Sequence, residues 1–193
     1  MRINKTSSVA LLTVLTAIAS SSERASGNLI VNGGFETFEL GTYVAWSTVN
    51  PTFSNPAPDY PHTGLYSAVF AKPQSAPMEL YQSLSINAGS QYEISFWLLN
   101  ANAVAGSNGF SVLWHGVSVF NQSPVHHLNE GYKFYSIEVT APTNPIAELR
   151  FIGYDPGNAV VLDDVSVTLV PEPAAAASFM VAGLALLRRR RAC

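Results

Sequence analysis

The sequence predicts an all-β fold, a two-sheet antiparallel β-sandwich of the jelly-roll type, and three observations support this. Apolar and polar residues alternate in several short runs, which is the period of a strand with one buried face. Clusters of Gly, Pro, Asn and Ser separate these runs. No helical pattern of ten uninterrupted residues occurs between residues 26 and 170. Many short strands joined by turns are typical of sandwiches and jelly rolls.

Four runs carry the alternation most clearly. Residues 92–99 place Phe96 on one face of a strand and Trp97 on the other. Residues 110–115 place Trp114 in phase with two apolar neighbours, which predicts that this tryptophan is buried. The other two runs are residues 135–140 and 161–168.

The N-terminus has the pattern of a secretory signal peptide. Arg2 and Lys5 give a basic start, residues 9–18 are apolar and uncharged, and small residues stand at Ala17 and Ala19. We therefore expect residues 1–19 to be a signal peptide removed after Ala19 as the chain is exported through the inner membrane. A later cut within residues 20–26 stays open.

The C-terminus carries three elements in a fixed order: a Pro-Glu-Pro motif, an apolar run at 174–187 and four arginines. A helix of this run would be roughly 21 Å long, short of the ~30 Å hydrocarbon core of a bilayer. The arginines resist translocation, which predicts a weak, transient insertion with the extreme C-terminus in the cytoplasm. An ordinary tail anchor is the alternative. The motif and arginine positions are Pro171, Glu172, Pro173, Arg188, Arg189, Arg190 and Arg191.

This tail resembles the PEP-CTERM sorting signal of bacteria with an outer membrane and an exopolysaccharide-associated envelope. The resemblance covers residues 171–193 and implies that an exosortase-type enzyme is a partner and cuts near the Pro-Glu-Pro motif. It also implies delivery to the cell surface or secretion.

Removal of both ends leaves one acidic domain, residues 26–170. This body has three basic and eleven acidic residues, a net charge of −8. Such a surface repels phosphate backbones, so nucleic acid is a poor candidate partner. The single cysteine, Cys193, lies in the tail, so the body has no thiol or disulfide.

Blocks along the body resemble bacterial carbohydrate-binding-module-like, galactose-binding-like jelly rolls. These blocks are residues 28–36 (NLIVNGGFE), Trp46, 62–69 (HTGLYSAV), 81–86, 89–97 (GSQYEISFW), 110–116 and 162–167 (LDDVSV). The resemblance implies a non-catalytic envelope or extracellular-matrix protein that binds polysaccharide. The alternatives are a glycan-acting enzyme and a purely structural or adhesive matrix protein with no sugar ligand.

The same resemblance implies a structural calcium ion that ties the first strand to the last. Its ligands would be Glu36 and either Asp163 or Asp164, with backbone carbonyls completing the shell. In a regular strand the two aspartates face opposite sides, and Asp163 lies with the valines. We hypothesise that Asp163 points inward and binds the ion with Glu36, because an unpaired carboxylate there is costly. The alternative is that these carboxylates are solvated or cap turns.

Sugar binding needs exposed aromatic rings, because pyranose faces stack on π surfaces. Trp97 is the best strand-borne candidate, since it faces away from Phe96. Tyr60 and Asp59 lie in a proline-rich segment at 51–61 that is expected at a sandwich edge. The full set of aromatic candidates is Trp46, Tyr60, Tyr81, Trp97, Trp114 and Tyr154.

No catalytic constellation is visible in the sequence. There is no Gly-x-Ser-x-Gly elbow, and the four histidines, at positions 62, 115, 126 and 127, have no evident partner. A glycosidase-type pair of carboxylates stays open, because any two of the eleven acids can meet in a fold.

Overall fold

The structure, a computed structural model, describes residues 27–39, 41–51, 60–101, 108–125 and 131–171. All of them fall in one unit, Ala25–Glu172. The predicted signal peptide, Asp59, and the sorting segment from Glu172 onward, including its apolar run and arginines, lie outside the described residues.

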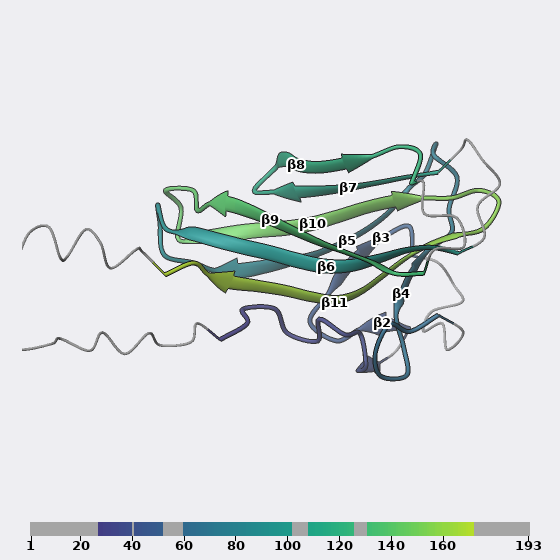
Figure 1. Cartoon of the computed structure of the whole chain (residues 1–193), viewed down its shortest axis with the longest axis horizontal. Coiled ribbons are helices and arrows are strands. Elements are labelled where there is room, and N and C mark those ends of the chain that lie inside the picture. Colours follow the sequence, from purple (N-terminus) through teal and green to yellow (C-terminus); the bar gives the residue numbers. More distant parts are fainter. Residues whose placement is uncertain (1–26, 40, 52–59, 102–107, 126–130, 172–193) are drawn as a thin grey trace, which may run out of the picture. The chain divides into compact units, whose positions relative to one another are not determined.

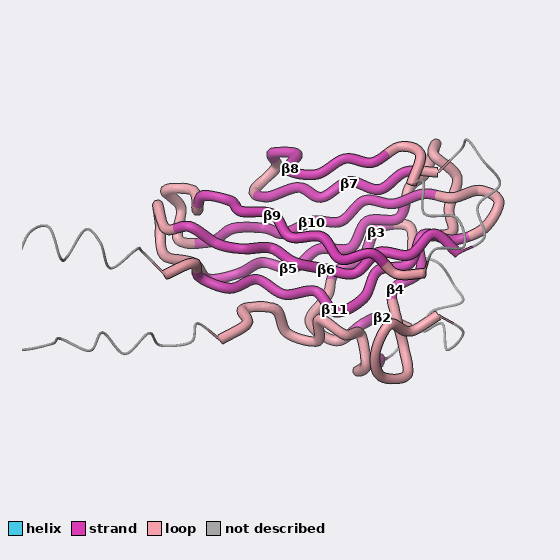
Figure 2. Tube along the Cα trace, viewed as in Figure 1, coloured by secondary structure: helices cyan, strands magenta, loops and turns pink. Residues whose placement is uncertain are grey.

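The described residues form strands and no helix (Figure 2). Accordingly, no membrane-spanning helix is found among them. The strands are β1 (Phe38–Glu39), β2 (Thr42–Tyr43), β3 (Ser47–Val49), β4 (Ala68–Phe70), β5 (Met78–Ser85), β6 (Gln91–Ala101), β7 (Gly109–Trp114), β8 (Val117–Gln122), β9 (Lys133–Thr140), β10 (Ile146–Tyr154) and β11 (Ala159–Leu169).

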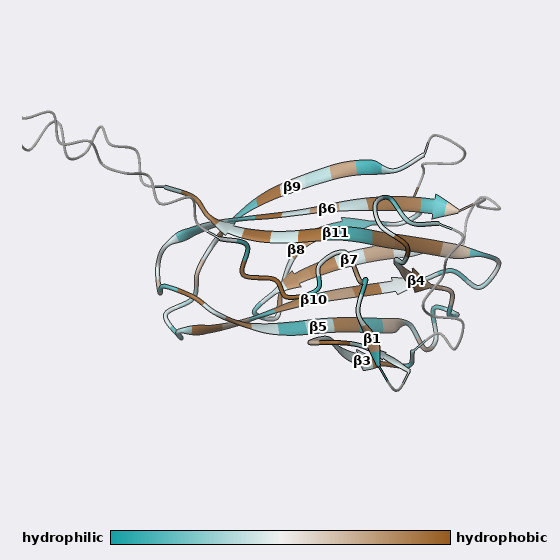
Figure 3. Ribbon diagram, turned by 90° about the horizontal axis from the view of Figure 1, so that it is seen from below, coloured by the Kyte–Doolittle hydropathy of each residue, from teal (hydrophilic) through white to brown (hydrophobic). Residues whose placement is uncertain are grey.

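Two antiparallel sheets face each other, and a small β1–β2 ribbon accompanies them (Figures 1 and 3). The five-stranded sheet has the order β3-β5-β10-β7-β8, and the four-stranded sheet has the order β4-β11-β6-β9. Neighbouring strands are often far apart in sequence, which is the connectivity of a jelly roll rather than a meander. The predicted two-sheet antiparallel sandwich is confirmed.

The inner faces of the two sheets form the main hydrophobic core. Phe96 of β6 contacts the rings of Phe110 and Phe151 from the opposite sheet at centroid distances of 6.0 and 5.7 Å. Trp114 is 4 % exposed, so its predicted burial is confirmed. Hydropathy alternates along the strands, as a sandwich with one buried and one exposed face per sheet requires (Figure 3).

A β-bulge interrupts β11, and the regular alternation predicted for residues 161–168 is wrong at this point. Asp163 pairs with Trp97 of β6, but the next paired residue is Ser166, opposite Ser95. Two residues on β11 therefore oppose one on β6, which switches the side of every later side chain. Leu162 and Val165 both reach the main core, whereas Asp163 shares the outer face with Trp97.

The N-terminal segment runs beside the second half of β11. The backbone amide of Leu29 donates to the Val167 carbonyl at 2.9 Å, and the Val165 amide donates to the Gly33 carbonyl at 3.0 Å. These contacts place Glu36, which follows shortly after, next to the bulge. The fold thus brings the first and last segments of the body together.

Candidate functional site

Asp163 is completely buried, but its cover is the 60–66 segment and not the opposite sheet. Its Oδ2 accepts hydrogen bonds from the backbone amides of His62 at 2.8 Å and Thr63 at 3.3 Å. Its Oδ1 accepts from the Asp164 amide at 2.8 Å. The expectation of burial is confirmed, and the direction is corrected: the carboxylate lies on the outer face of the four-stranded sheet.

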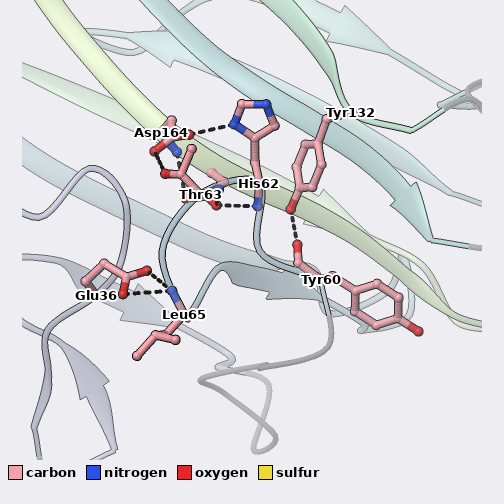
Figure 4. A network of polar contacts seen from close by, with 8 residues as sticks. Glu36, Tyr60, His62, Thr63, Leu65, Tyr132 and Asp164 are labelled. Atoms are coloured by element: carbon pink, nitrogen blue, oxygen red, sulfur yellow. Dashed lines mark hydrogen bonds and ion pairs between the residues drawn. The ribbon is translucent and has the colours of Figure 1, made fainter.

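Glu36 holds the other half of the same segment. Its carboxylate accepts hydrogen bonds from the backbone amides of Leu65 and Tyr66, each at 2.9 Å. Figure 4 shows the contact with Leu65. Gly64 between these contacts has a φ of +67°, and a Cβ there would lie 2.3 Å from the Glu36 Oε1 atom. A glycine is therefore needed for the close approach of this loop to the carboxylate. Both carboxylates cap the turn, as the alternative reading of the sequence expected.

Asp164 is the bulge residue, with a φ of +48°. Its carboxylate contacts the His62 Nδ1 atom at 2.7 Å and accepts a hydrogen bond from the Thr63 hydroxyl at 2.7 Å. The prediction that the histidines lack a partner is thus wrong for His62. No local sequence pattern could predict this pair, because His62 and Asp164 are 102 positions apart in the chain.

We call Glu36, Asp163 and Asp164, with the 62–66 turn that they hold by hydrogen bonds, the clamp. Five rings belong to residues in or beside it, and two of them, Trp97 and Phe134, stand on the outer face of the four-stranded sheet. The imidazole of His62 stacks on Trp97 at a centroid distance of 3.9 Å and an interplanar angle of 19°. Tyr132 meets His62 edge-on at 5.0 Å and donates a hydrogen bond to the Tyr60 carbonyl (Figure 4). Phe134 lies 5.3 Å from Trp97. We call Tyr60, His62, Trp97, Tyr132 and Phe134 the aromatic patch.

The exposed rings of the patch differ in part from the predicted ones. Tyr60 is 40 % exposed, as its position in an edge loop suggested, and Phe134 is 53 % exposed. Trp97 does face away from Phe96, but His62 covers one face of its indole. Phe134 was not among the rings predicted from the sequence. Its signal was the adjacent pair Phe134 and Tyr135, since neighbouring strand residues face opposite sides and only one of the two can be buried.

Burial raises the pKa of two groups at the clamp, Asp163 and Tyr132. Desolvation raises the pKa of Asp163 to about 6, although the amides of Asp164, His62 and Thr63 act in the opposite direction. Burial also raises the pKa of Tyr132, and the negative charge of Asp163 adds to that rise. Tyr132 therefore stays a neutral hydrogen-bond donor, and the carboxyl of Asp163 is a group that a cation would stabilise.

The three predicted calcium ligands surround one glycine. The position of a Cβ on Gly34 would lie 3.4 Å from the Asp164 Oδ1, 3.9 Å from the Glu36 Cγ and 4.0 Å from the Asp163 Oδ1. The carboxylate oxygens of these three residues are hard donors of the kind that calcium prefers, although the Glu36 oxygens are near Gly64 rather than Gly34. As the carboxylates stand, no group of three or more His, Cys, Asp or Glu side chains among the described residues converges on one metal position. The donor chemistry fits calcium, and backbone carbonyls would have to complete the shell.

A second polar array stands on the outer face of the five-stranded sheet. The Arg150 guanidinium forms ion pairs with Glu79 and with Glu148, the latter at 2.7 Å, and lies 4.4 Å from the centre of the Tyr81 ring. These hydrogen bonds, first to Glu148 and then to Glu79, raise the Arg150 pKa despite its partial burial. The alternation of β5 and β10 places all four residues on one face, but their register could not be known from the sequence.

A groove of about 360 Å³ lies away from the patch, beside the β7–β8 turn and the C-terminal end of β9. Its lining is largely apolar and includes Trp114, Val119 and Val139, with Glu138 and Thr140 as polar groups.

Comparisons with solved structures place the chain among jelly rolls. TmCBM61, solved in complex with β-1,4-galactotriose, has a TM-score of 0.54 and 19 % identity; the match covers 75 % of this chain and 100 % of that one. The CBM22-1 xylan-binding domain of Xyn10C from Paenibacillus barcinonensis has a TM-score of 0.50 and 16 % identity, with 77 % and 98 % covered. The body is thus similar to carbohydrate-binding-module domains.

The fold also occurs inside larger proteins. The enzymatically active domain of tailspike protein 4 of bacteriophage CBA120 matches with a TM-score of 0.51 and 18 % identity; the match covers 74 % of this chain but only 21 % of that one. No protein-family model matches the sequence, and no characterised protein sequence matches it. At these identities the similarities establish the fold, and function has to be argued from the site.

Proposed function

We propose that the chain is an exported, non-catalytic protein of the bacterial envelope or extracellular matrix that binds glycans through the aromatic patch. The observation that carries this proposal is the set of solvent-facing rings beside a rigid clamp. Phe134 and Tyr60 are 53 % and 40 % exposed, and Phe134 lies 5.3 Å from Trp97, on which His62 stacks. Exposed rings held on strands suit the apolar faces of sugars. The similarity to glycan-binding modules supports the same conclusion.

The proposal is tested by probing a glycan array with the full-length chain kept in a mild detergent. We expect retention on a subset of polysaccharides and no release of reducing sugar. Retention with release of products would instead support a glycan-acting enzyme. If protein that melts cooperatively is retained on none of the glycans, glycan binding is refuted and a structural or adhesive role remains.

A structural calcium ion is part of this proposal. Glu36 and Asp163, with Asp164 nearby, would hold the ion, which would tie the 28–36 segment to β11. The ion would supply the positive charge that the buried Asp163 lacks among its described contacts. We expect excess calcium to raise the melting temperature and a chelator to lower it, with magnesium as the control. Identical melting curves under all three conditions would overturn the calcium assignment without affecting glycan binding.

Export and sorting complete the proposal. A signal peptide at residues 1–19 and an exosortase-type cut near Pro171, Glu172 and Pro173 would deliver residues 26–170 to the surface or medium of an outer-membrane-bearing bacterium. Mass spectrometry of the mature protein in such a host tests this. Changing Glu172 to Ala and the four arginines to Ser should each leave an uncut, membrane-retained chain. Release of both variants at the wild-type mass would refute the sorting role.

A further inference from the structure

The register of β6, β9 and β11 organises the outer face of the four-stranded sheet into rows. Residues directly opposite each other in an antiparallel pair share a face. Trp97 is opposite Phe134, Ser95 is opposite Ser136, and Glu93 is opposite Glu138. Successive rows are about 7 Å apart, because two strand residues span that distance.

β11 extends the same rows on its side of β6. Ser166 is opposite Ser95, and Thr168 is opposite Glu93. The bulge at Asp164 makes this possible, since it turns Ser166 and Thr168 outward while Val165 and Val167 enter the core. Beyond the carboxylates, the Gln91 side-chain amide donates to the Thr140 hydroxyl at 3.0 Å. The face therefore runs from aromatic rings through hydroxyls to carboxylates. We call this surface the β6–β9 face.

The pair of glutamates is unusual. Glu93 and Glu138 are directly opposite like charges, an arrangement that weakens a sheet. Among the described ion pairs, none involves either residue. Hydrogen bonds donated by a ligand to these two carboxylates would offset the repulsion between them.

Within the described strands β6, β9 and β11, no lysine or arginine is directed to this face. Lys133 precedes Phe134 on β9, so it points to the other side of the strand. Neither β6 nor β11 contains a lysine or arginine. Arg150 stands on the other sheet, between Glu79 and Glu148. His62 is already engaged with Asp164 at 2.7 Å.

We propose that the β6–β9 face binds an extended, electrically neutral glycan and rejects anionic ones such as uronate-rich polysaccharides. The inference rests on the proposed function and adds its ligand class and direction. One sugar stacks at Phe134, and the following sugars donate hydroxyl hydrogens to the serine, threonine and glutamate oxygens. A uronate near Glu93 and Glu138 meets two like charges, and each unit charge about 4 Å away costs roughly fivefold in affinity in water.

The test compares retention of the full-length chain on neutral polysaccharides (β-1,4-galactan, xylan) and anionic ones (alginate, polygalacturonate) at about 0.05 M and 0.5 M salt. We expect at least roughly tenfold weaker retention of the anionic set at low salt, narrowing at high salt as screening shortens the reach of charge. The double variant Glu93→Gln/Glu138→Gln should raise the ratio of anionic to neutral retention by about tenfold. Retention of anionic glycans equal to or above the neutral set would overturn the ligand class.

The location has its own test. Phe134→Ala should weaken neutral-glycan retention by about tenfold, because the stacking ring is lost. Ile146→Ala is the matched control, since Ile146 is also 53 % exposed but stands on β10 of the other sheet. Equal retention by the two variants would refute the β6–β9 face as the binding surface. If no glycan is retained by the wild-type chain, the proposed function fails, and that result differs from an inverted preference.

Discussion

Gly33 and Gly34 are neighbours in the sequence, yet the structure gives them very different tolerance for a side chain. A Cβ on Gly33 would lie 2.1 Å from the backbone oxygen of Val165, whereas the closest atom to a Cβ on Gly34 is the Asp164 Oδ1 at 3.4 Å. The first distance is an overlap with backbone on β11, and the second is an ordinary contact. Gly33→Ala and Gly34→Ala therefore form a matched pair.

Gly33→Ala should lower the free energy of unfolding by about 2–3 kcal/mol. Overpacking in a tight contact costs about 1–3 kcal/mol. Separation of the strands also loses the hydrogen bond from the Val165 amide to the Gly33 carbonyl, about 1 kcal/mol. Alanine offsets part of this loss, about 0.4–1 kcal/mol, by restricting the unfolded chain. Gly34→Ala keeps only that last effect and should be neutral or slightly stabilising.

Thermal melting and hydrogen exchange measure the difference. At roughly 3 °C per kcal/mol for a domain of this size, Gly33→Ala should melt about 6–9 °C below Gly34→Ala. The Val165 amide should lose protection in Gly33→Ala, and the Leu65 and Tyr66 amides should follow because Glu36 moves with the segment. Melting temperatures within 2 °C of each other would refute the edge-to-edge contact between the 28–36 segment and β11.

Three further predictions concern single groups. In the chelated protein, stability should fall by about 2 kcal/mol as the pH rises from 4 to 7, because the Asp163 pKa is about 6 in the folded state against 3.8 in the unfolded chain, so the folded state binds the proton more tightly. Urea titrations at each pH check this, and rising stability across that range would contradict it. Asn32→Ala should lower stability by about 3 kcal/mol. The Asn32 side-chain amide donates to the carbonyls of Thr37 and Val44, its oxygen accepts from the Thr37 amide, and its backbone has a φ of +56°, which alanine tolerates less well. An unchanged denaturation midpoint would count against this. Arg150→Ala should cost about 1 kcal/mol, with a smaller loss at high salt, because its ion pairs with Glu79 and Glu148 are partly exposed; a salt-independent loss would show that packing on Tyr81 matters more.

Local periodicity explains how much of the fold could be predicted. The alternation at 92–99 correctly placed Phe96 inside and Trp97 outside, because strand geometry alone decides which residues share a face. Turn-forming residues marked the strand ends, because Gly, Pro, Asn and Ser favour the backbone conformations of turns. The bulge after Asp163 was not predictable, since it depends on how β11 pairs with β6 and on the segment that covers the carboxylate.

The candidate site depends on contacts that no local pattern encodes. Asp163 and the His62 amide are 101 positions apart, and Glu36 and the Leu65 amide are 29 apart. The family resemblance pointed to these carboxylates as calcium ligands, but not to the backbone amides that they bind. Likewise, Glu93 and Glu138 each had the right phase for an outer face, and only the register of β6 with β9 made them a pair.

The clamp and the aromatic patch are connected, because the same 60–66 segment contributes to both. The Asp163 carboxylate accepts hydrogen bonds from the His62 and Thr63 amides, and the Asp164 carboxylate contacts the imidazole that stacks on Trp97. The stack in turn supports the ring next to it, Phe134. The buried carboxylate that is unfavourable for stability at neutral pH is therefore also the group that orders the aromatic patch. A cation at this carboxylate would stabilise the fold and the patch together, so glycan affinity and melting temperature should respond to it in the same direction.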